Sequence, residues 1–498
     1  MNIAKILEQS SFFFPNRPAI SENAAETSYA QLNERSNRIA TALLKLGVAP
    51  GDHIALCAPN SEEWVAFYFG VLKTGAVAVT LSSLLKRQEL EMLVGHCCPK
   101  LLFTFDGLLE DVANIRDEVG IENVICDNGD VSFERLVQMG EATFKAIDRD
   151  RSDTAAILYT GGTTGIPKGV ELTHENIAQS IQNVIFYERS NENDMALLFL
   201  PFNHVFGQMH IMNATITSAG CLELIPAFDM DVVLDILKRG RVTKLYAVPT
   251  IYARFVELEG LKEKLGAVRY CFSAASSMAA EHVRRWKELT GMPIHESYGM
   301  TEAAPMVTYN HYYRHVIGSV GTPVSGVEVQ IRDPQGNLNA PGDKGEICIR
   351  GRNIMKGYLN NPQGNSDAFW QDGWFRSGDV GIIDADGYLY IVDRLKDMVI
   401  TGGENVYPRE VEEILYARSD VSECAVIGLP DPEWGEKVTA VIATKSGQAI
   451  DPTELKDYLK LHLSPFKVPK EYRTVAELPK SPTGKILKRV LRQNLMDE

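Results

Sequence analysis

The sequence lacks several features that would each define a class of protein. It has no excess of positive charge: 50 Lys and Arg stand against 65 Asp and Glu, a formal net charge of −15, which argues against an extended nucleic-acid or anionic-membrane surface. No apolar run approaches the roughly 18 residues of a membrane-spanning helix, and residues 1–17 contain no signal-peptide core. We therefore expect a cytoplasmic protein with no nucleic-acid partner and no integral membrane segment.

The eight cysteines lack a pattern as well: only Cys97 and Cys98 are neighbours, and no spacing resembles a metal site. They are interpreted as buried thiols of a reducing compartment. What the chain does have is an ordinary globular composition, 45% hydrophobic and 23% charged, over 498 residues. A chain of this length is expected to form at least two domains and is large enough to be an enzyme.

Strand-like apolar runs alternate with helical patterns through most of the chain, which indicates an α/β fold. Residues 53–58 (HIALCA) predict a buried strand, and residues 76–81 predict the next one. Between them, Asn60 or Ser61 is expected to cap a helix that ends near Gly75. No internal repeat and no low-complexity segment interrupts this order.

The pattern changes after about Asp393. The elements expected there are a strand over 387–393, a helix from Pro408, strands over 423–427 and 438–444, and a helix over 452–463. They indicate a compact α+β unit of about a hundred residues. Residues 465–498 hold eight basic and four acidic residues, which predicts either a solvated face or a cationic surface that meets a polyanionic ligand.

The segment with most chemical information is YTGGTTGIPKGV, residues 159–170, which follows a strand-like run. Glycines let a backbone approach an anion closely, and hydroxyls and amide N–H groups can then surround phosphate oxygens. Lys168 adds a positive charge. A flexible loop is the alternative interpretation. The segment does not have the Walker P-loop spacing, because Lys168 precedes Gly169 and no Ser or Thr follows it.

YTGGTTGIPKGV resembles the signature loop of the adenylate-forming superfamily, which includes acyl-CoA synthetases, peptide-synthetase adenylation domains and beetle luciferases. Further motifs of that superfamily follow in its order, so that the resemblance covers essentially the whole chain. It implies an α/β fold with a large N-terminal adenylate-forming domain, residues 1–393, and a small mobile α+β C-terminal domain, residues 394–498. Where the superfamily usually has serine this chain has Gly161, so the phosphate cradle has one hydroxyl fewer.

The resemblance implies a nucleotide site for ATP. Its loop residues would be Thr160, Gly161, Gly162, Thr163, Thr164, Gly165 and Lys168. In SYGMTE, residues 297–302, the resemblance assigns Tyr298 and Gly299 to the adenine side and Thr301 to the α-phosphate. It assigns Glu302 to Mg²⁺, a hard cation that prefers oxygen ligands. A surface helix start at residues 301–302 is the alternative.

Two further motifs resemble the superfamily's ribose site. Asp379 of WFRSGDVG and Arg394 of VDRLKD would hold the two ribose hydroxyls as acceptor and donor, although each could be only a structural ion pair. Lys396 aligns with the hinge about which the small domain turns between half-reactions.

The small domain resembles the superfamily at two more motifs. Gly402 and Gly403 of TGGENVYP would line the tunnel for the pantetheine arm of CoA, or form only a turn. Lys485 of SPTGK would bridge the substrate carboxylate and the α-phosphate during adenylation.

The acyl pocket is expected around LPFNHVFGQ and SAASSM. The resemblance makes His204 a gate between the acyl pocket and the thiol tunnel, and counts it with Lys485, Thr301 and Glu302 as catalytic. The expected pocket residues are His204, Phe206, Ala274, Ala275, Gly299, Pro305 and Met306. SAASSM departs from the usual Ser-Gly-Gly-Ala-Pro-Leu, and no aspartate near residues 229–233 serves as an anchor for a substrate amino group. The remaining lining is apolar, which suits an uncharged acyl tail.

These motifs together predict an acid–thiol ligase that uses ATP, Mg²⁺ and CoA to convert a small-molecule carboxylic acid into acyl-AMP and then into a thioester. A medium- or long-chain fatty acid is the expected substrate, with an aryl acid second. One alternative delivers the acyl group to the phosphopantetheine of an acyl carrier protein; the absence of an insertion in residues 351–379 weakens it. A nucleotide-binding protein with an inactive site is another, disfavoured by Lys485, Glu302 and Asp379.

Overall fold

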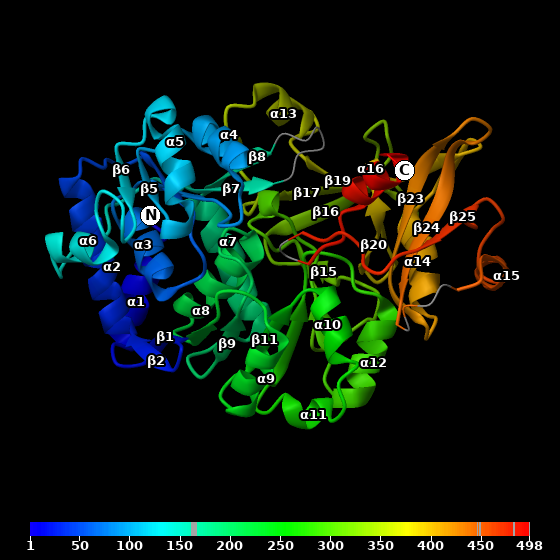
Figure 1. Ribbon diagram of the computed structural model, residues 1–498, viewed down its shortest axis with the longest axis horizontal. Coiled ribbons are helices and arrows are strands. Elements are labelled where there is room, and N and C mark those ends of the chain that lie inside the picture. Colours follow the sequence, from blue (N-terminus) through cyan, green and yellow to red (C-terminus); the bar gives the residue numbers. More distant parts are fainter. Residues whose placement is uncertain (161–166, 446, 448–449, 482–483, 498) are drawn as a thin grey trace.

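In the computed structural model, residues 1–497 are described except 161–166, 446, 448–449 and 482–483. Figure 1 shows a large N-terminal domain and, beside it, a smaller domain made by the C-terminal part of the chain, in orange and red. The large domain contains two seven-stranded sheets, in the orders β13–β12–β11–β9–β10–β1–β2 and β18–β8–β7–β4–β3–β5–β6. Most neighbours in both sheets are parallel, and antiparallel pairs involve β2, β8 and β18 at the edges.

The strands of the first sheet are β13 (Ile294–Glu296), β12 (Tyr270–Ser273), β11 (Lys244–Ala247), β9 (Met195–Leu198), β10 (Cys221–Leu224), β1 (Pro18–Glu22) and β2 (Ala25–Ser28). Those of the second are β18 (Gly357–Tyr358), β8 (Lys168–Thr173), β7 (Thr154–Thr160), β4 (Val77–Thr80), β3 (His53–Leu56), β5 (Leu101–Phe103) and β6 (Asn123–Ile125). A four-stranded antiparallel sheet follows: β16 (Val327–Arg332), β17 (Gly345–Gly351), β19 (Phe375–Ile383) and β20 (Leu389–Arg394). A short pair completes the large domain: β14 (Thr308–Tyr309) and β15 (Thr322–Pro323).

The helices of the large domain are α1 (Lys5–Phe13), α2 (Tyr29–Lys45), α3 (Glu62–Lys73), α4 (Arg87–Cys97), α5 (Leu109–Val119), α6 (Phe133–Met139), α7 (His174–Glu188), α8 (Ala214–Thr217), α9 (Met230–Lys238), α10 (Pro249–Phe255), α11 (Leu261–Lys264), α12 (Ala280–Thr290) and α13 (Pro362–Asp367). A π-helical segment, η2 (Phe206–Asn213), precedes α8. One apolar core joins the two large sheets, since Leu158 of β7, Phe69 of α3 and Leu198 of β9 belong to the same buried cluster.

The strand–helix–strand unit predicted near the N-terminus is confirmed. β3 and β4 are parallel neighbours, and α3 connects them. Ser61 rather than Asn60 caps α3: its side chain accepts a hydrogen bond from the backbone N–H of Trp64 at 3.1 Å, which satisfies one of the free donors at the helix start.

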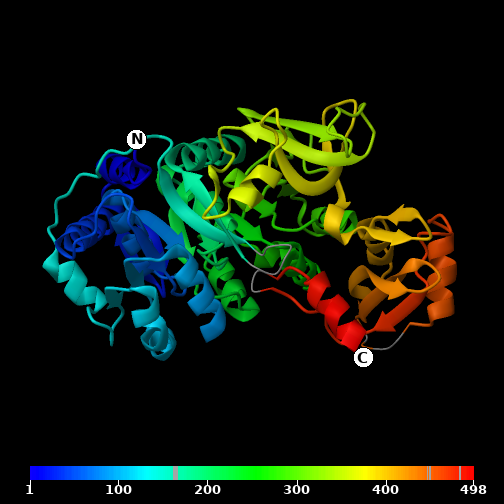
Figure 2. The same ribbon diagram turned by 90° about the horizontal axis from the view of Figure 1, so that it is seen from above.

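The small domain has its own sheet and its own cores, which fits the predicted α+β unit. Its strands are β21 (Val399–Thr401), β22 (Glu404–Val406), β23 (Val421–Asp431), β24 (Gly435–Thr444) and β25 (Glu471–Thr474), and its helices are α14 (Pro408–Tyr416), α15 (Pro452–Lys460) and α16 (Lys488–Asp497). The chain just before α16 runs back toward the large domain (Figure 2). This return path is what allows a C-terminal residue to reach the large domain.

Two expectations from composition need correction. Seven of the eight cysteines are buried, but Cys98, the residue that follows α4 at the helix end, is exposed. The cationic tail is largely neutralised inside the small domain. Its side chains that form ion pairs with acidic residues are Lys467, Arg473, Lys480, Lys488 and Arg492. Among the described helices, none has the length and apolar character needed to cross a bilayer.

Candidate active site

Two residues that lie fifteen positions apart face each other across a strand pair. Asp379 of β19 and Arg394 of β20 are direct partners in the antiparallel register, so their side chains project from the same face. Arg394 Nε lies 3.4 Å from Asp379 Oδ1, and the Tyr298 hydroxyl donates to Asp379 Oδ2 at 2.7 Å. Burial raises the pKa of Asp379 despite the nearby Arg394 charge. The three residues predicted for the adenosine part of the nucleotide thus form one cluster.

The turn after β13 is held in a tight form by Gly299. A Cβ at this position would lie 2.1 Å from the carbonyl oxygen of Pro305, a contact that no side chain can make. Residues 301–303 form a single 3-10 turn, so that Thr301 and Glu302 follow Tyr298 closely in space. Met306 is buried and pairs with Gly299 in an isolated β-bridge. The alternative interpretation, a surface helix start at residues 301–302, is therefore wrong, because Thr301 is buried and the turn ends at Ala303.

Glu302 and Lys168 approach the same tyrosine. The Tyr358 hydroxyl of β18 donates to Glu302 Oε1 at 3.0 Å, and Lys168 Nζ lies 4.6 Å from the centre of the Tyr358 ring. Lys168 pairs with Thr160 in the β7–β8 register. These contacts place both ends of the predicted phosphate loop and the predicted metal ligand at one edge of the sheet. Gly161, Gly162, Thr163, Thr164 and Gly165 lie outside the described residues.

The Glu302 carboxylate is a suitable ligand for a cation that also binds phosphate oxygens. Burial raises its pKa, although the hydrogen bond from Tyr358 and the charge of Arg394 oppose that shift. Within the described ranges, no group of three or more His, Cys, Asp or Glu side chains could hold a metal ion alone. Mg²⁺ is commonly bound through one or two carboxylates together with substrate phosphates and water, so a single glutamate fits such a site.

We expect Glu302→Ala to reduce pyrophosphate release by about a hundredfold at limiting Mg²⁺, the size typical for loss of one charge-stabilising group. The rate should recover partly at high Mg²⁺, because water can replace a missing carboxylate ligand. The check is a Mg²⁺ titration of the initial rate, with Tyr358→Phe as the matched control that retains the carboxylate. Near-wild-type rates for Glu302→Ala at limiting Mg²⁺ would rule out the metal assignment.

Lys485 reaches this cluster from the small domain. The Thr250 hydroxyl of α10 donates to the carbonyl oxygen of Gly484 at 3.3 Å, which fixes the preceding residue against the large domain. Burial, followed by the charge of Arg394, lowers the pKa of Lys485 to about 8. The Asp379 carboxylate partly opposes that shift. The ammonium therefore lies within electrostatic reach of the Asp379–Arg394 pair, although almost a hundred residues separate them in sequence.

This lowered pKa predicts a pH dependence. The ammonium form supports attack on a negatively charged phosphate, and it is lost as pH rises through about 8 rather than through the 10.5 of an ordinary lysine. We expect kcat/KM for acyl-AMP formation, which reports the free enzyme, to fall above pH 8. Thioester formation from supplied acyl-AMP should stay flat over the same range. The comparison of both pH profiles checks this, and an adenylation profile that is flat to pH 10 would contradict it.

His204 is half-buried and lies within electrostatic reach of Lys485. Its Nδ1 accepts a hydrogen bond from the backbone N–H of Phe206 at 3.2 Å, which places the proton of the neutral ring on Nε2. Burial, with the Lys485 charge, lowers the pKa of His204 to about 4, so the ring is neutral at pH 7. The Phe206 ring lies 5.7 Å from Phe272, the residue that leads into SAASSM. Ala274 and Ala275 are partly buried against the same core.

The predicted hinge residue lies within electrostatic reach of the nucleotide cluster, whereas the two predicted tunnel glycines do not reach it. Lys396 lies in a 3-10 turn between β20 and β21, and its charge contributes to the lowered pKa of Lys485. Gly402 and Gly403 have φ of +57° and +84° in the turn between β21 and β22. The N–H of Gly402 donates to Trp434 of the small domain at 2.8 Å. These contacts do not bring the two glycines to the nucleotide cluster.

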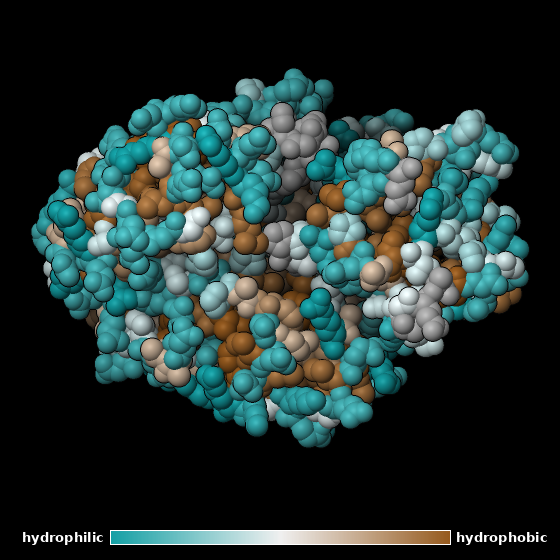
Figure 3. Space-filling view, viewed as in Figure 1, coloured by the Kyte–Doolittle hydropathy of each residue, from teal (hydrophilic) through white to brown (hydrophobic). Residues whose placement is uncertain are grey.

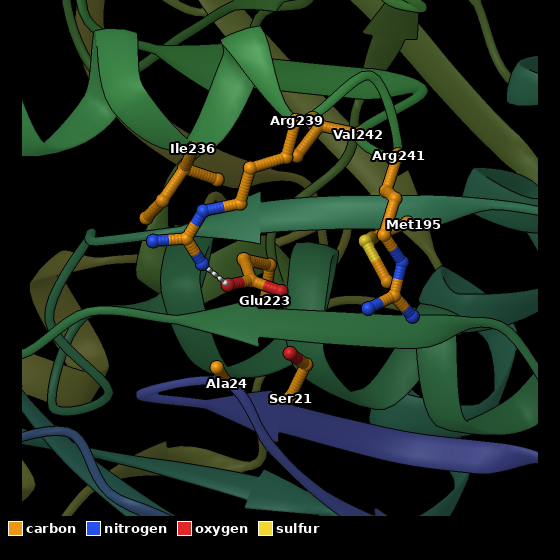
Figure 4. A pocket seen from close by; sticks show the side chains of 8 residues that line it. All are labelled: Ser21, Ala24, Met195, Glu223, Ile236, Arg239, Arg241 and Val242. Carbon is orange, nitrogen blue, oxygen red and sulfur yellow. Dashed lines mark ion pairs between the residues drawn. The ribbon is translucent and has the colours of Figure 1, made fainter.

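Two surface pockets lie apart from this cluster. One of 210 Å³ is lined by β1, β9, β10 and the end of α9, and Figure 4 shows Glu223 facing Arg239 across it. Because that carboxylate and guanidinium already pair at 4.0 Å, and no predicted site residue lines the pocket, we assign it no role in the chemistry. The other, of 420 Å³, is lined by aromatic and arginine side chains around Tyr309. In Figure 3, apolar side chains also gather over α9, α10 and β11.

The sequence matches two models of known protein families, and these matches identify the family of the chain. Residues 7–359 match the AMP-binding enzyme model, and residues 410–485 match its C-terminal domain model. The chain belongs to the AMP-binding enzyme family. As a member, it is 34% identical to a feruloyl-CoA synthase of Amycolatopsis over 96% of both chains. It is 31% identical to a long-chain-fatty-acid–CoA ligase of Bacillus subtilis, over 98% of this chain and 94% of that one.

Solved structures agree with this membership. ATP-bound MatB from Rhodopseudomonas palustris superposes with a TM-score of 0.94 at 35% identity, covering 100% of this chain and 99% of that one. The predicted fold, a large α/β domain followed by a small C-terminal domain, is thereby confirmed. The sequence motifs did not predict three contacts: Tyr358 with Glu302, Thr250 with Gly484, and His210 with Glu188. None lies in a recognisable motif, since each depends on segments that meet only in the fold.

Proposed function

We propose that this AMP-forming acyl-CoA synthetase carries out both half-reactions at the cluster around Asp379 and Arg394. The carboxylate of the acid attacks the α-phosphorus of ATP, the bond to pyrophosphate breaks, and acyl-AMP forms. The thiol of CoA then attacks the acyl carbon, and AMP leaves. The approach of Lys485 to the Asp379–Arg394 pair is the observation that supports this most.

The proposed roles follow from charge and hydrogen bonding. Asp379 accepts from and Arg394 donates to ribose hydroxyls, and Tyr298 packs against adenine while its hydroxyl orients Asp379. The ammonium of Lys485 stabilises the negative charge that develops between carboxylate and phosphate. Mg²⁺ would supply charge neutralisation at the phosphates, with Glu302 as its protein ligand and Thr301 beside it.

We further propose a boundary between the two domains at residues 393 and 394, with Lys396 as the hinge. The arrangement described here serves adenylation, because Lys485 is at the site and the glycines of the turn at 402–403 are not. A rotation about the hinge would move Lys485 away from the site and bring the turn at 402–403 to it. CoA is the proposed acceptor, with a carrier protein as the alternative. The segment between β17 and β19 contains only β18 and α13, with no inserted element, which favours CoA.

Among substrates, we propose an acid whose tail carries no second charge. The sequence favours a medium- or long-chain fatty acid and places aryl acids second, and the fatty-acid and feruloyl names of two relatives support both. The carboxylate of Asp229 is occupied as the cap of α9, where it accepts from the N–H groups of Asp231 and Val232, so it is not available to hold a substrate amino group.

A pyrophosphate-exchange panel tests this proposal. We expect ATP–pyrophosphate exchange with fatty acids or aryl acids to exceed exchange with α-amino acids and dicarboxylates at least tenfold. A second charge buried in an apolar pocket without a partner costs several kcal/mol. Formation of the CoA thioester in the same reactions, measured by chromatography, tests the acceptor. Faster exchange with an amino acid or a dicarboxylate than with any fatty or aryl acid would contradict the substrate proposal.

A further inference from the structure

The larger of the two surface pockets has walls that suit a ligand. This pocket, of 420 Å³, lies between the end of α7, the segment that follows β14 and the start of β20. Its walls are aromatic side chains and two arginines, Arg189 and Arg314, and none of the described residues that line it is acidic. The volume falls within the roughly 300–1,000 Å³ of small-molecule sites. No residue of the proposed nucleotide, acyl or thiol sites lines it.

The aromatic side chains of this pocket offer open ring faces. The Tyr187 ring lies 5.4 Å from the buried Tyr309 ring and 5.3 Å from the His311 ring. Toward solvent, Phe186 and Tyr313 are 72% and 85% exposed. Large aromatic faces that stay in contact with water favour a partner that covers them, and a planar ring does so by stacked or edge-to-face contact.

Hydrogen bonds hold the walls in place without a ligand. The Tyr388 hydroxyl donates to the Arg314 carbonyl oxygen at 2.8 Å, and the Ser325 N–H donates to the Tyr187 hydroxyl at 3.2 Å. The side chain of Asn310 closes the segment after β14, because it donates to the Val316 carbonyl oxygen at 2.8 Å and accepts from the Val316 N–H at 3.0 Å. A ligand would therefore meet a preformed surface, which lowers the entropic cost of binding.

Arg189 supplies a positive charge that is not compensated. Arg314 pairs with Asp386 at 2.6 Å, whereas Arg189 has no acidic partner within the described ranges. The guanidinium carbon of Arg189 lies 4.8 Å from the centre of the Tyr312 ring and 5.3 Å from that of Tyr313. A guanidinium that lies over ring faces keeps N–H groups along its edge for an anion.

The backbone of Arg189 is held in an unusual conformation. Its φ is +52° at the end of α7, a left-handed position where Gly or Asn is usual. Both neighbours are fixed: Glu188 pairs with His210 at 2.6 Å and with Lys244 at 3.3 Å, and Lys244 donates to the Ser190 hydroxyl at 2.6 Å. Strained residues that their surroundings hold in place occur preferentially at ligand sites.

We propose that this pocket binds a small planar aromatic monocarboxylate, with its ring against the tyrosine faces and its carboxylate on the Arg189 guanidinium. A guanidinium matches a carboxylate through two parallel hydrogen bonds. One uncompensated cation balances one carboxylate, whereas a dianion or a nucleotide would bring charge that Arg314, already paired with Asp386, does not offset. An alkyl acid lacks a flat face to cover the rings. The site is separate from the proposed active site, so this inference goes beyond the proposed function.

Binding of 2-naphthoate to the full-length enzyme, measured by calorimetry, tests the chemistry of the ligand. We expect a Kd of about 1 mM or below, as ordinary ligand efficiency gives a ligand of this size. Two analogues should each bind this pocket at least tenfold more weakly. Decahydro-2-naphthoate keeps the charge without the flat ring, and 2-naphthalenemethanol keeps the ring without the charge.

Variants separate this pocket from any 2-naphthoate bound in the acyl pocket. Arg189→Gln should lower the number of 2-naphthoate molecules bound per chain by one, or weaken one binding event at least tenfold. Tyr313→Ser, at a largely exposed side chain, should weaken the same event. Arg285→Gln, which removes an exposed arginine of α12, is the matched control and should change nothing. ATP–pyrophosphate exchange should be unchanged in all three variants.

The outcomes distinguish this inference from the proposed function. Unchanged 2-naphthoate binding in Arg189→Gln and Tyr313→Ser would overturn the pocket as a binding site. Equal binding of either analogue at the event that Arg189→Gln removes would overturn the ligand class. If Arg189→Gln does not fold, Tyr313→Ser and the analogues decide. Absence of ATP–pyrophosphate exchange with every acid would instead contradict the proposed function and leave this inference standing.

Discussion

Replacement of Lys485 by alanine should abolish most acyl-AMP formation and leave the second half-reaction nearly intact. An ammonium about 4 Å from a reacting oxygen contributes on the order of 4 kcal/mol at an effective dielectric constant of about 20. Removal of one preorganised charge-stabilising group typically costs ~10²–10³ in rate. We expect at least that loss in pyrophosphate release. Supplied acyl-AMP and CoA should still give thioester, because the proposed rotation removes Lys485 from the site in that step.

A matched control lies five residues earlier in the chain. Lys480 pairs with Glu423 at 2.7 Å inside the small domain, away from the nucleotide cluster. Lys480→Ala therefore removes one positive charge from the same segment and should change neither half-reaction by more than a few-fold. A Lys485→Ala enzyme that loses thioester formation as strongly as acyl-AMP formation would contradict the separate use of this lysine.

Replacement of Gly403 by leucine should have the opposite effect. In the present arrangement a Cβ at residue 403 meets no atom within 4 Å, so adenylation has room for the new side chain. After the proposed rotation the same side chain would lie in the path of the CoA thiol, where we expect a loss of a hundredfold or more in thioester formation, since misplacement of a reacting group by about 1 Å can cost ~10². Both half-reactions should be measured separately, by pyrophosphate release and by thioester formation.

Backbone strain needs its own control at this position. Gly403 has φ of +84°, a left-handed value that costs a residue with a side chain roughly 1–2 kcal/mol. Gly403→Ala carries the same strain without the bulk, so any effect it shares with leucine is conformational. Equal losses of thioester formation for alanine and leucine, or a loss of adenylation in both, would argue against a tunnel at this turn.

The sequence predicted the fold better than it predicted the contacts. Local signals were sufficient for the β3–α3–β4 unit, because the Ser61 cap and the apolar runs are read within a few residues. Asp379 and Arg394 lie close together because β19 and β20 form an antiparallel pair joined by the turn at Asp384–Gly387. Their two motifs lie on either side of this turn, only a few residues apart in sequence. The resemblance to a family supplied their proposed roles.

Contacts between distant segments could not be predicted in this way. Glu188, His210 and Lys244 come from α7, a π-helical segment and β11, and nothing in their local sequence distinguishes them from surface charges. Their burial depends on how these elements pack in the first large sheet. The same holds for Tyr358, whose hydroxyl meets Glu302 only because β18 pairs with β8 at the edge of the second sheet.

The central claim is that the acid carboxylate attacks the α-phosphorus of ATP. It is tested most directly with an acid labelled with ¹⁸O in both carboxylate oxygens, incubated with the enzyme, MgATP and CoA. The account predicts one ¹⁸O atom in the AMP released and none in pyrophosphate, as read by mass spectrometry. Unlabelled AMP, or label in inorganic phosphate together with ADP, would show that the carboxylate is activated in another way and would contradict the account.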